Sequence, residues 1–157
     1  MFKIREGSLD DFQQLLTLYR ELYQARALAE PDYFKETDHP IDIEFLEEVL
    51  TDDKKRLYVV EKAGEIIAFT IFIGMNQMET ARTEQRRIIK IEEMYVRKDH
   101  IYKGIDQHLF EKIKKFALNR GAEEIILELP EKEQEIIDYY EERLRLVPKF
   151  RTMSFKL

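Results

Sequence analysis

The chain lacks cysteine altogether, and it contains only four prolines and five glycines among its 157 residues. The absence of cysteine excludes disulfide bridges and thiolate metal sites. The three histidines, His39, His100 and His108, are too scattered to indicate a metal centre, so we expect no metal. A reducing cytoplasm permits a protein without cysteine, and the cytoplasm is the location that we expect.

Long apolar runs are also absent. No stretch approaches the ~18 apolar residues that cross a bilayer, and the polar start of the chain does not resemble a signal peptide. The net charge of −6 argues against nucleic-acid binding and favours cationic small molecules. We therefore expect neither a membrane nor a nucleic-acid partner, and we leave open whether the chain forms a homodimer.

Strand and helix patterns succeed one another along the chain. The length predicts one domain, residues 1–157. The expected order is β-α-α-β-β-β-α-β-α-β, a mixed α/β fold. The expected strands are Phe2–Arg5, Leu57–Lys62, Glu65–Ile73, Ile88–Val96, Glu124–Leu129 and Phe150–Leu157; the expected helices follow Ser8, Asp42 and Gly104 and cover Glu131–Leu146.

The most informative stretch runs from Ile88 to Gly121. It predicts a strand, a turn at Gly104 and a helix that ends at Gly121. Such a turn directs backbone N–H groups at one spot beside the positive end of the helix dipole, an arrangement that holds phosphates. A lone glycine is more often an ordinary turn, however, and Asp106 adds a negative charge that opposes a phosphate.

Three side chains are candidates for proton transfer. Glu92 and Glu93 lie in the strand before the turn, and because strand neighbours point to opposite faces, we expect one of them to face a pocket. That carboxylate could act as a general base, whereas the alternative is a residue that simply faces solvent. Tyr140 shares a helical stripe with Ile136, so it is either a core aromatic or a general acid whose hydroxyl reaches a cleft.

With these residues in view, the chain resembles the GNAT family of N-acetyltransferases over nearly its whole length. The segment Ile91–Ile105 is similar to the family's central strand and acetyl-CoA loop, whose pattern is Gln/Arg, two residues, Gly, one residue, Gly/Ala. Gly104 matches the first glycine, while Ile101 and Asp106 depart from the pattern. Tyr139-Tyr140-Glu141 resembles the Phe-Tyr-Glu of the family's second motif.

The resemblance implies a mostly antiparallel sheet of six or seven strands, with acetyl-CoA bound between the fourth and fifth. Glu92 or Glu93 would then be the base and Tyr140 the general acid. An acidic pocket would receive a small-molecule or protein amine. The residues that would hold acetyl-CoA are Met94, Tyr95, Val96, Ile101, Tyr102, Lys103, Gly104, Ile105 and Asp106.

Three hypotheses follow. The first is an enzyme, an acetyl-CoA-dependent N-acetyltransferase that acts on a primary amine. The second is a catalytically decayed binding or regulatory domain on the same fold, which Ile101 and Asp106 favour. The third is an acyltransferase that uses another acyl donor. Titration with acetyl-CoA separates the second hypothesis from the other two.

Overall fold

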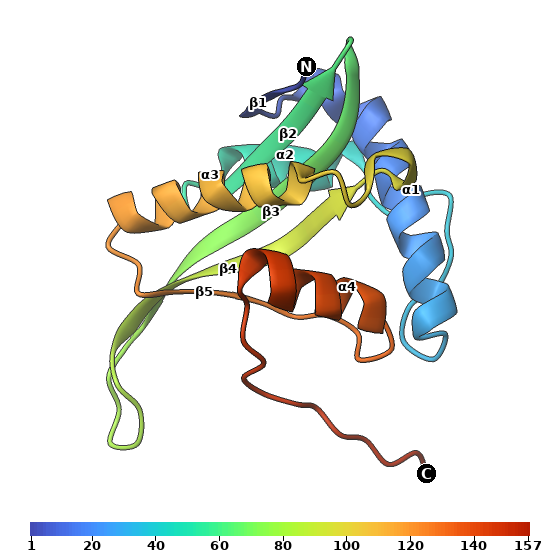
Figure 1. Ribbon diagram of the computed structural model, residues 1–157. Coiled ribbons are helices and arrows are strands. Elements are labelled where there is room, and N and C mark those ends of the chain that lie inside the picture. Colours follow the sequence, from blue (N-terminus) through green and yellow to red (C-terminus); the bar gives the residue numbers. More distant parts are fainter.

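The computed structural model describes residues 1–157, and its centre is one five-stranded sheet in the order β1-β2-β3-β4-β5 (Figure 1). Neighbouring strands are antiparallel except β4 and β5, which are parallel. This confirms the mixed α/β fold, although the sheet has five strands and not six or seven. The strands are β1 (Lys3–Glu6), β2 (Lys55–Lys62), β3 (Glu65–Gln77), β4 (Arg86–Val96) and β5 (Glu124–Leu127).

Helices cover both faces of the sheet. The helices are α1 (Phe12–Ala29), α2 (Ile43–Thr51), α3 (Ile105–Asn119) and α4 (Gln134–Tyr139). One core joins α1 and α2 to β2 and β3, and two further clusters join α3 and α4 to the opposite face. Figure 1 shows α3 and α4 in front of the sheet and α2 behind it. None of the helices is both long and apolar enough to cross a membrane.

Local signals explain where several elements begin and end. The Asp42 side chain accepts a hydrogen bond from the Phe45 N–H at 2.8 Å and so caps α2. Gly64 turns the β2–β3 hairpin with φ 79°, and Gly121 ends α3 with φ 68°, both in the left-handed region that glycine tolerates best. These three boundaries agree with those predicted from the sequence.

Strand β4 contains a β-bulge next to the two glutamates. Ile71 of β3 pairs with Glu93, whereas the next residue, Phe72, pairs with Ile91, so Glu92 is an additional residue in a β-bulge. Pairing with β5 extends only from Ile88 to Ile91. Beyond that point β4 continues to Val96 without a neighbour on its β5 side, which opens the gap that the family resemblance implied.

Two elements predicted near the C-terminal end of the chain differ from those in the structure. The helix expected over Glu131–Leu146 is shorter: α4 ends at Tyr139, and Tyr140–Leu144 forms a π-helical turn. The last strand, predicted over Phe150–Leu157, is wrong, because these residues pair with no strand of the chain and are exposed. An alternating pattern specifies a strand only where a sheet edge is within reach.

Candidate functional site

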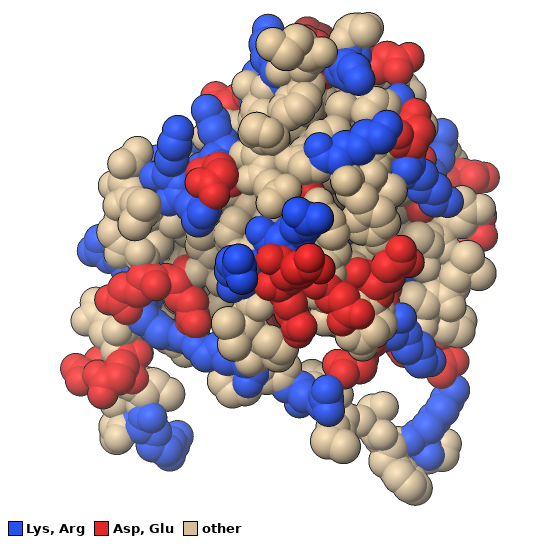
Figure 2. Space-filling model, viewed as in Figure 1, with Lys and Arg blue, Asp and Glu red and all other residues tan.

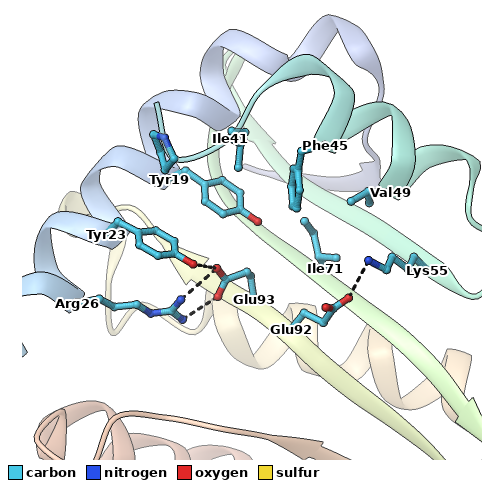
Figure 3. A pocket seen from close by; sticks show the side chains of 11 residues that line it. Tyr19, Tyr23, Arg26, Ile41, Phe45, Val49, Lys55, Ile71, Glu92 and Glu93 are labelled. Carbon is cyan, nitrogen blue, oxygen red and sulfur yellow. Dashed lines mark hydrogen bonds and ion pairs between the residues drawn. The ribbon is translucent and has the colours of Figure 1, made fainter. Parts of the chain in front are cut away.

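A pocket of about 260 Å³ opens beside β4 on the face covered by α1 and α2 (Figure 3). Its apolar wall contains Ile41, Phe45 and Ile71, together with tyrosine rings from α1. Its polar groups are Arg26, Lys55, Glu92 and Glu93. The pocket therefore combines an aromatic and aliphatic lining with a few charged groups, which is the usual composition of a small-molecule site.

Glu93 is buried and paired with Arg26 of α1. Glu93 Oε2 accepts a hydrogen bond from Nη1 of Arg26 at 3.1 Å and one from the Tyr23 hydroxyl at 3.4 Å. Glu93 Oε1 lies 2.7 Å from Nη2 of Arg26. Burial raises the pKa of the Glu93 carboxyl, while Arg26 and Tyr23 oppose that rise. The charge of Glu93 is therefore largely neutralised from within the chain.

Glu92 lines the same pocket, which corrects the expectation that the two glutamates point to opposite faces. The bulge shifts the alternation of β4 by one residue, so both carboxylates face the α1–α2 side. Glu92 Oε1 lies 3.5 Å from Lys55 Nζ, and its side chain is 38% exposed. The pocket thus contains two carboxylates and two cationic side chains, and the expectation of an acidic pocket is wrong.

The pocket also contains polar atoms that the chain does not satisfy. Two fully buried side-chain atoms have no polar partner in the chain, Tyr19 Oη and Arg26 Nε, while Glu93 Oε1 is contacted only by its ion-pair partner Arg26. All three residues line this pocket, and the Tyr19 side chain is 97% buried with its hydroxyl directed inward (Figure 3). Buried polar groups are nearly always hydrogen-bonded. Such a cluster indicates a site that receives a polar ligand.

The main chain of β4 offers further polar groups at the gap beside β5. The Arg97 N–H bonds to the Ile67 carbonyl of β3 at 2.8 Å. Because N–H and C=O groups alternate in direction along a strand, those of Tyr95 also face β3, whereas those of Met94 and Val96 face the gap. Two main-chain donors therefore lie on the open side of β4, where no strand pairs with them.

The glycine turn at Gly104 has a carboxylate, that of Asp106, close to its backbone N–H groups. Gly104 precedes α3 with φ 85°, and the carboxylate of Asp106 follows in the first helical turn. It accepts hydrogen bonds from the Gln107 N–H and from the Tyr139 hydroxyl, both at 3.1 Å. Burial raises the pKa of Asp106, and these hydrogen bonds oppose the rise. The Asp106 carboxylate thus occupies part of the N–H cradle, the group of backbone N–H donors at the glycine turn that would hold a phosphate.

Tyr140 is the first residue of the π-helical turn that follows α4. Its ring is buried in the core formed by α3, α4 and the sheet. Its hydroxyl has no hydrogen-bond partner in the chain, yet unlike the Tyr19 hydroxyl it is not fully enclosed. Burial raises the pKa of Tyr140 well above its ordinary value, negative charge at Asp106 and Glu133 adds to the rise, and Arg26 opposes it.

The remaining predicted residues have mixed surroundings. The Tyr102 ring lies 4.8 Å from that of Tyr139, and Lys103 Nζ bonds to the Asp99 carbonyl at 3.1 Å. The Ile105 side chain belongs to the core, while the Tyr95 hydroxyl donates to Glu21 at 2.6 Å and not into the gap. Ile101 lies in the loop before the glycine turn.

The sequence-based interpretation missed the three α1 residues of the pocket. Tyr19, Tyr23 and Arg26 are spaced by four and three positions, so they share one face of the helix. The sequence analysis singled out none of them. A charged residue on the apolar stripe of a helix was the signal, because a buried cation needs a partner or a function.

Comparisons with known proteins identify a family and a fold. A model of the "Acetyltransferase (GNAT) family" matches residues 14–144. A search of curated protein sequences finds no significant match. The structure contains no group of three or more histidine, cysteine, aspartate or glutamate side chains arranged to hold a metal ion.

Solved structures share the fold at low sequence identity. Mutants of the BH1408 protein from Bacillus halodurans match with a TM-score of 0.94 over 99% of both chains, at 18% identity. An aminoglycoside acetyltransferase, meta-AAC0020, from an uncultured soil metagenomic sample has a TM-score of 0.72 at 18% identity, covering 99% of this chain and 96% of that chain. Ribosomal-protein-alanine N-acetyltransferase from Brucella melitensis biovar Abortus 2308 has a TM-score of 0.69 at 20% identity over 99% of both chains.

Proposed function

Because the chain belongs to the GNAT family of acetyltransferases, we propose that it transfers an acetyl group from acetyl-CoA to a primary amine. The observation that carries this proposal is the cluster of unsatisfied polar atoms beside the open edge of β4. The pocket receives the amine on the α1–α2 side, and the gap receives the thioester. We place the enzyme in the cytoplasm, a setting compatible with a chain free of cysteine.

The residues at the gap fit the acyl end of acetyl-CoA. The N–H groups of Met94 and Val96 are donors without a strand partner, suited to a carbonyl oxygen and to the amides of the pantetheine arm. At the other end of the gap, the Asp106 carboxylate opposes the negative pyrophosphate. We therefore expect acetyl-CoA to bind, with an affinity that Asp106 lowers.

In the proposed reaction, Glu92 is the base. Both oxygens of Glu93 lie within 3.1 Å of Arg26, whereas Glu92 has only one distant partner. Glu92 would remove a proton from the substrate ammonium, and the Met94 N–H would donate to the oxygen that gains negative charge. The neutral amine would then attack the carbonyl that bound acetyl-CoA supplies, so that the C–N bond forms as the C–S bond to CoA breaks. Tyr140 would donate its phenolic proton to the departing sulfur.

The pocket favours a compact acceptor. A volume of about 260 Å³ admits only a small molecule or a single protruding side chain or chain terminus. The ring of Phe45 and the side chains of Ile41 and Ile71 suit an apolar body, and the Tyr19 hydroxyl suits a polar substituent. We therefore propose a small amphipathic amine, with a protein amine as the broader alternative.

The proposal is tested first by the binding of acetyl-CoA to the wild-type chain, measured by calorimetry. Release of CoA thiol is then followed with a panel of small amines. No binding at all would favour the second candidate function, a catalytically decayed domain, over both acyltransferases. Binding without turnover for any amine would overturn acetyl transfer to an amine.

Asp106 provides a separate prediction. Asp106→Gly should strengthen acetyl-CoA binding by about tenfold, because it removes charge and bulk from the N–H cradle. Asp106→Asn removes the charge while keeping the size, so it should give part of that gain. Glu111→Gln, which removes an exposed carboxylate from the same helix, is the control. Unchanged or weaker binding in Asp106→Gly would show that the pyrophosphate does not lie at this turn.

A further inference from the structure

The two ion pairs of the pocket differ in how closely their atoms approach. Arg26 holds Glu93 with contacts of 2.7 and 3.1 Å. Lys55 Nζ lies 3.5 Å from Glu92 Oε1, and the Lys55 ammonium makes no hydrogen bond within the chain. Figure 3 shows the Lys55–Glu92 pair on the Ile71 side of the pocket, away from Arg26. The looser pair is therefore the one that a ligand can open.

Lys55 begins β2, and its side chain is only 16% exposed. An ammonium has three donors, and lysine is almost never buried without a partner. One carboxylate at 3.5 Å satisfies little of that requirement. The position therefore favours a ligand that brings a second negative group to Lys55.

The substrate ammonium of the proposed reaction competes with Lys55 for the same carboxylate. Glu92 is the proposed base, so the ammonium must lie beside it, where Lys55 already lies. A simple cationic amine would place two positive charges against one carboxylate, and like charges at this range repel each other. An acceptor that carries its own carboxylate gives Lys55 a new partner and removes the repulsion.

The charge of the pocket is balanced, although the chain has a net charge of −6. Figure 2 shows acidic side chains gathered over α4, where Glu135 and Asp138 are exposed. These acids lie on the outer surface and not among the residues that line the pocket. A zwitterion adds no net charge to a balanced, partly buried site, whereas a cation adds one without a partner.

Two buried donors of the pocket also need an acceptor. The Tyr19 hydroxyl and Arg26 Nε have no polar partner in the chain, and Figure 3 shows the hydroxyl directed inward. An ammonium supplies donors only, so a simple amine leaves both protons unsatisfied, whereas a carboxylate supplies acceptors only. A buried donor without an acceptor is costly. The unpartnered atoms therefore favour the same ligand group as Lys55 does.

We propose that the acceptor is an α-amino acid with an apolar side chain, whose ammonium lies at Glu92 and whose carboxylate lies at Lys55. This inference rests on the proposed acetyl transfer and narrows its acceptor. The two groups share one carbon, so they can enter together between partners that face each other, and the side chain lies against Ile41 and Phe45. The nitrogen loses a proton to Glu92 and gains the acetyl group, CoA leaves as its thiol, and the carboxylate is unchanged. A protein amine, which has no carboxylate on the same carbon, is excluded.

The first test compares each apolar L-amino acid with its amide and its decarboxylated amine, for example leucine with leucinamide and isoamylamine. With saturating acetyl-CoA, kcat/KM for the amino acid should exceed that for the other two by at least about tenfold. An amide or amine that reacts equally well would overturn the inference while acetyl transfer to an amine stands. Calorimetry with the same compounds needs no turnover, so preferential binding of the amino acids without acetylation would support them as ligands and contradict the proposed reaction.

Lys55→Met separates a ligand contact from a structural role. It should weaken the binding of leucine by at least about tenfold and leave that of isoamylamine unchanged or stronger, because Glu92 loses its competing cation. Lys55→Arg keeps the charge and should keep most of the preference. Lys54→Met removes the exposed lysine next to it and is the control, with both affinities unchanged. Equal losses for both compounds in Lys55→Met, or no loss for leucine, would refute the carboxylate contact.

Discussion

Glu92→Gln is expected to lower turnover by about 10²–10⁴-fold while the protein folds normally and binds acetyl-CoA with unchanged affinity. Glutamine keeps the shape of the side chain but cannot accept a proton from the ammonium. Glu92 is partly exposed and interacts only with Lys55 at 3.5 Å, so its replacement should cost little stability. Steady-state kinetics with saturating acetyl-CoA measure the turnover, a thermal melt measures the stability, and calorimetry measures the affinity for acetyl-CoA.

Glu93→Gln is the matched control, since it makes the same change one residue away. It leaves the charge of Arg26 buried without its carboxylate, so it should lower the free energy of unfolding by roughly 3 kcal/mol or more. The two variants thus separate chemistry from stability. If Glu93→Gln loses turnover while Glu92→Gln retains it, Glu93 is the base. Activity that survives both changes would remove this role from the pair.

Tyr140→Phe is expected to reduce kcat by about 10²–10⁴-fold. Phenylalanine preserves the packing of the ring in the core to which Phe72 and Ile113 also belong, and it removes only the hydroxyl. Burial and nearby negative charge raise the pKa of Tyr140, so the phenol keeps its proton at neutral pH. It is therefore available to donate that proton to the departing sulfur.

The neighbouring tyrosine gives the contrast for that experiment. The Tyr139 hydroxyl donates to Asp106 at 3.1 Å, so Tyr139→Phe should change the affinity for acetyl-CoA more than it changes kcat. Full turnover in Tyr140→Phe, or a loss of stability alone, would show that Tyr140 is a core residue and not the general acid. A fall in kcat for Tyr139→Phe but not for Tyr140→Phe would instead identify Tyr139 as the general acid.

Several site features could be anticipated from local sequence. The glycine turn before Ile105, the helix to Asn119 and the placement of Glu92 and Glu93 on the fourth strand follow from β-branched runs, helical spacing and one glycine. The proximity of Asp106 to the N–H cradle was also readable, since it lies two residues after Gly104. The roles proposed for these residues stay predictions until they are measured.

Other features depend on contacts between distant segments. The bulge at Glu92 is visible only in the register between β3 and β4, and it is what brings both glutamates to one pocket. Arg26 reaches Glu93 across 67 positions of the chain, and Tyr139 reaches Asp106 across 33. No local pattern encodes such pairs, so the charge balance of the pocket could not be deduced from the sequence.

The sequence by itself determined the class of fold, the alternation of elements, the cap of α2 at Asp42 and the glycine turns, because these depend on interactions within a few residues. Tertiary structure alone decided the pairing of Arg26 with Glu93, the hydrogen bond between Tyr139 and Asp106, and the fate of the segment Phe150–Leu157. The physical reason is that periodicity states which side of a segment is apolar. Only the assembled sheet determines what lies against that side, and whether an edge is within reach to make it a strand.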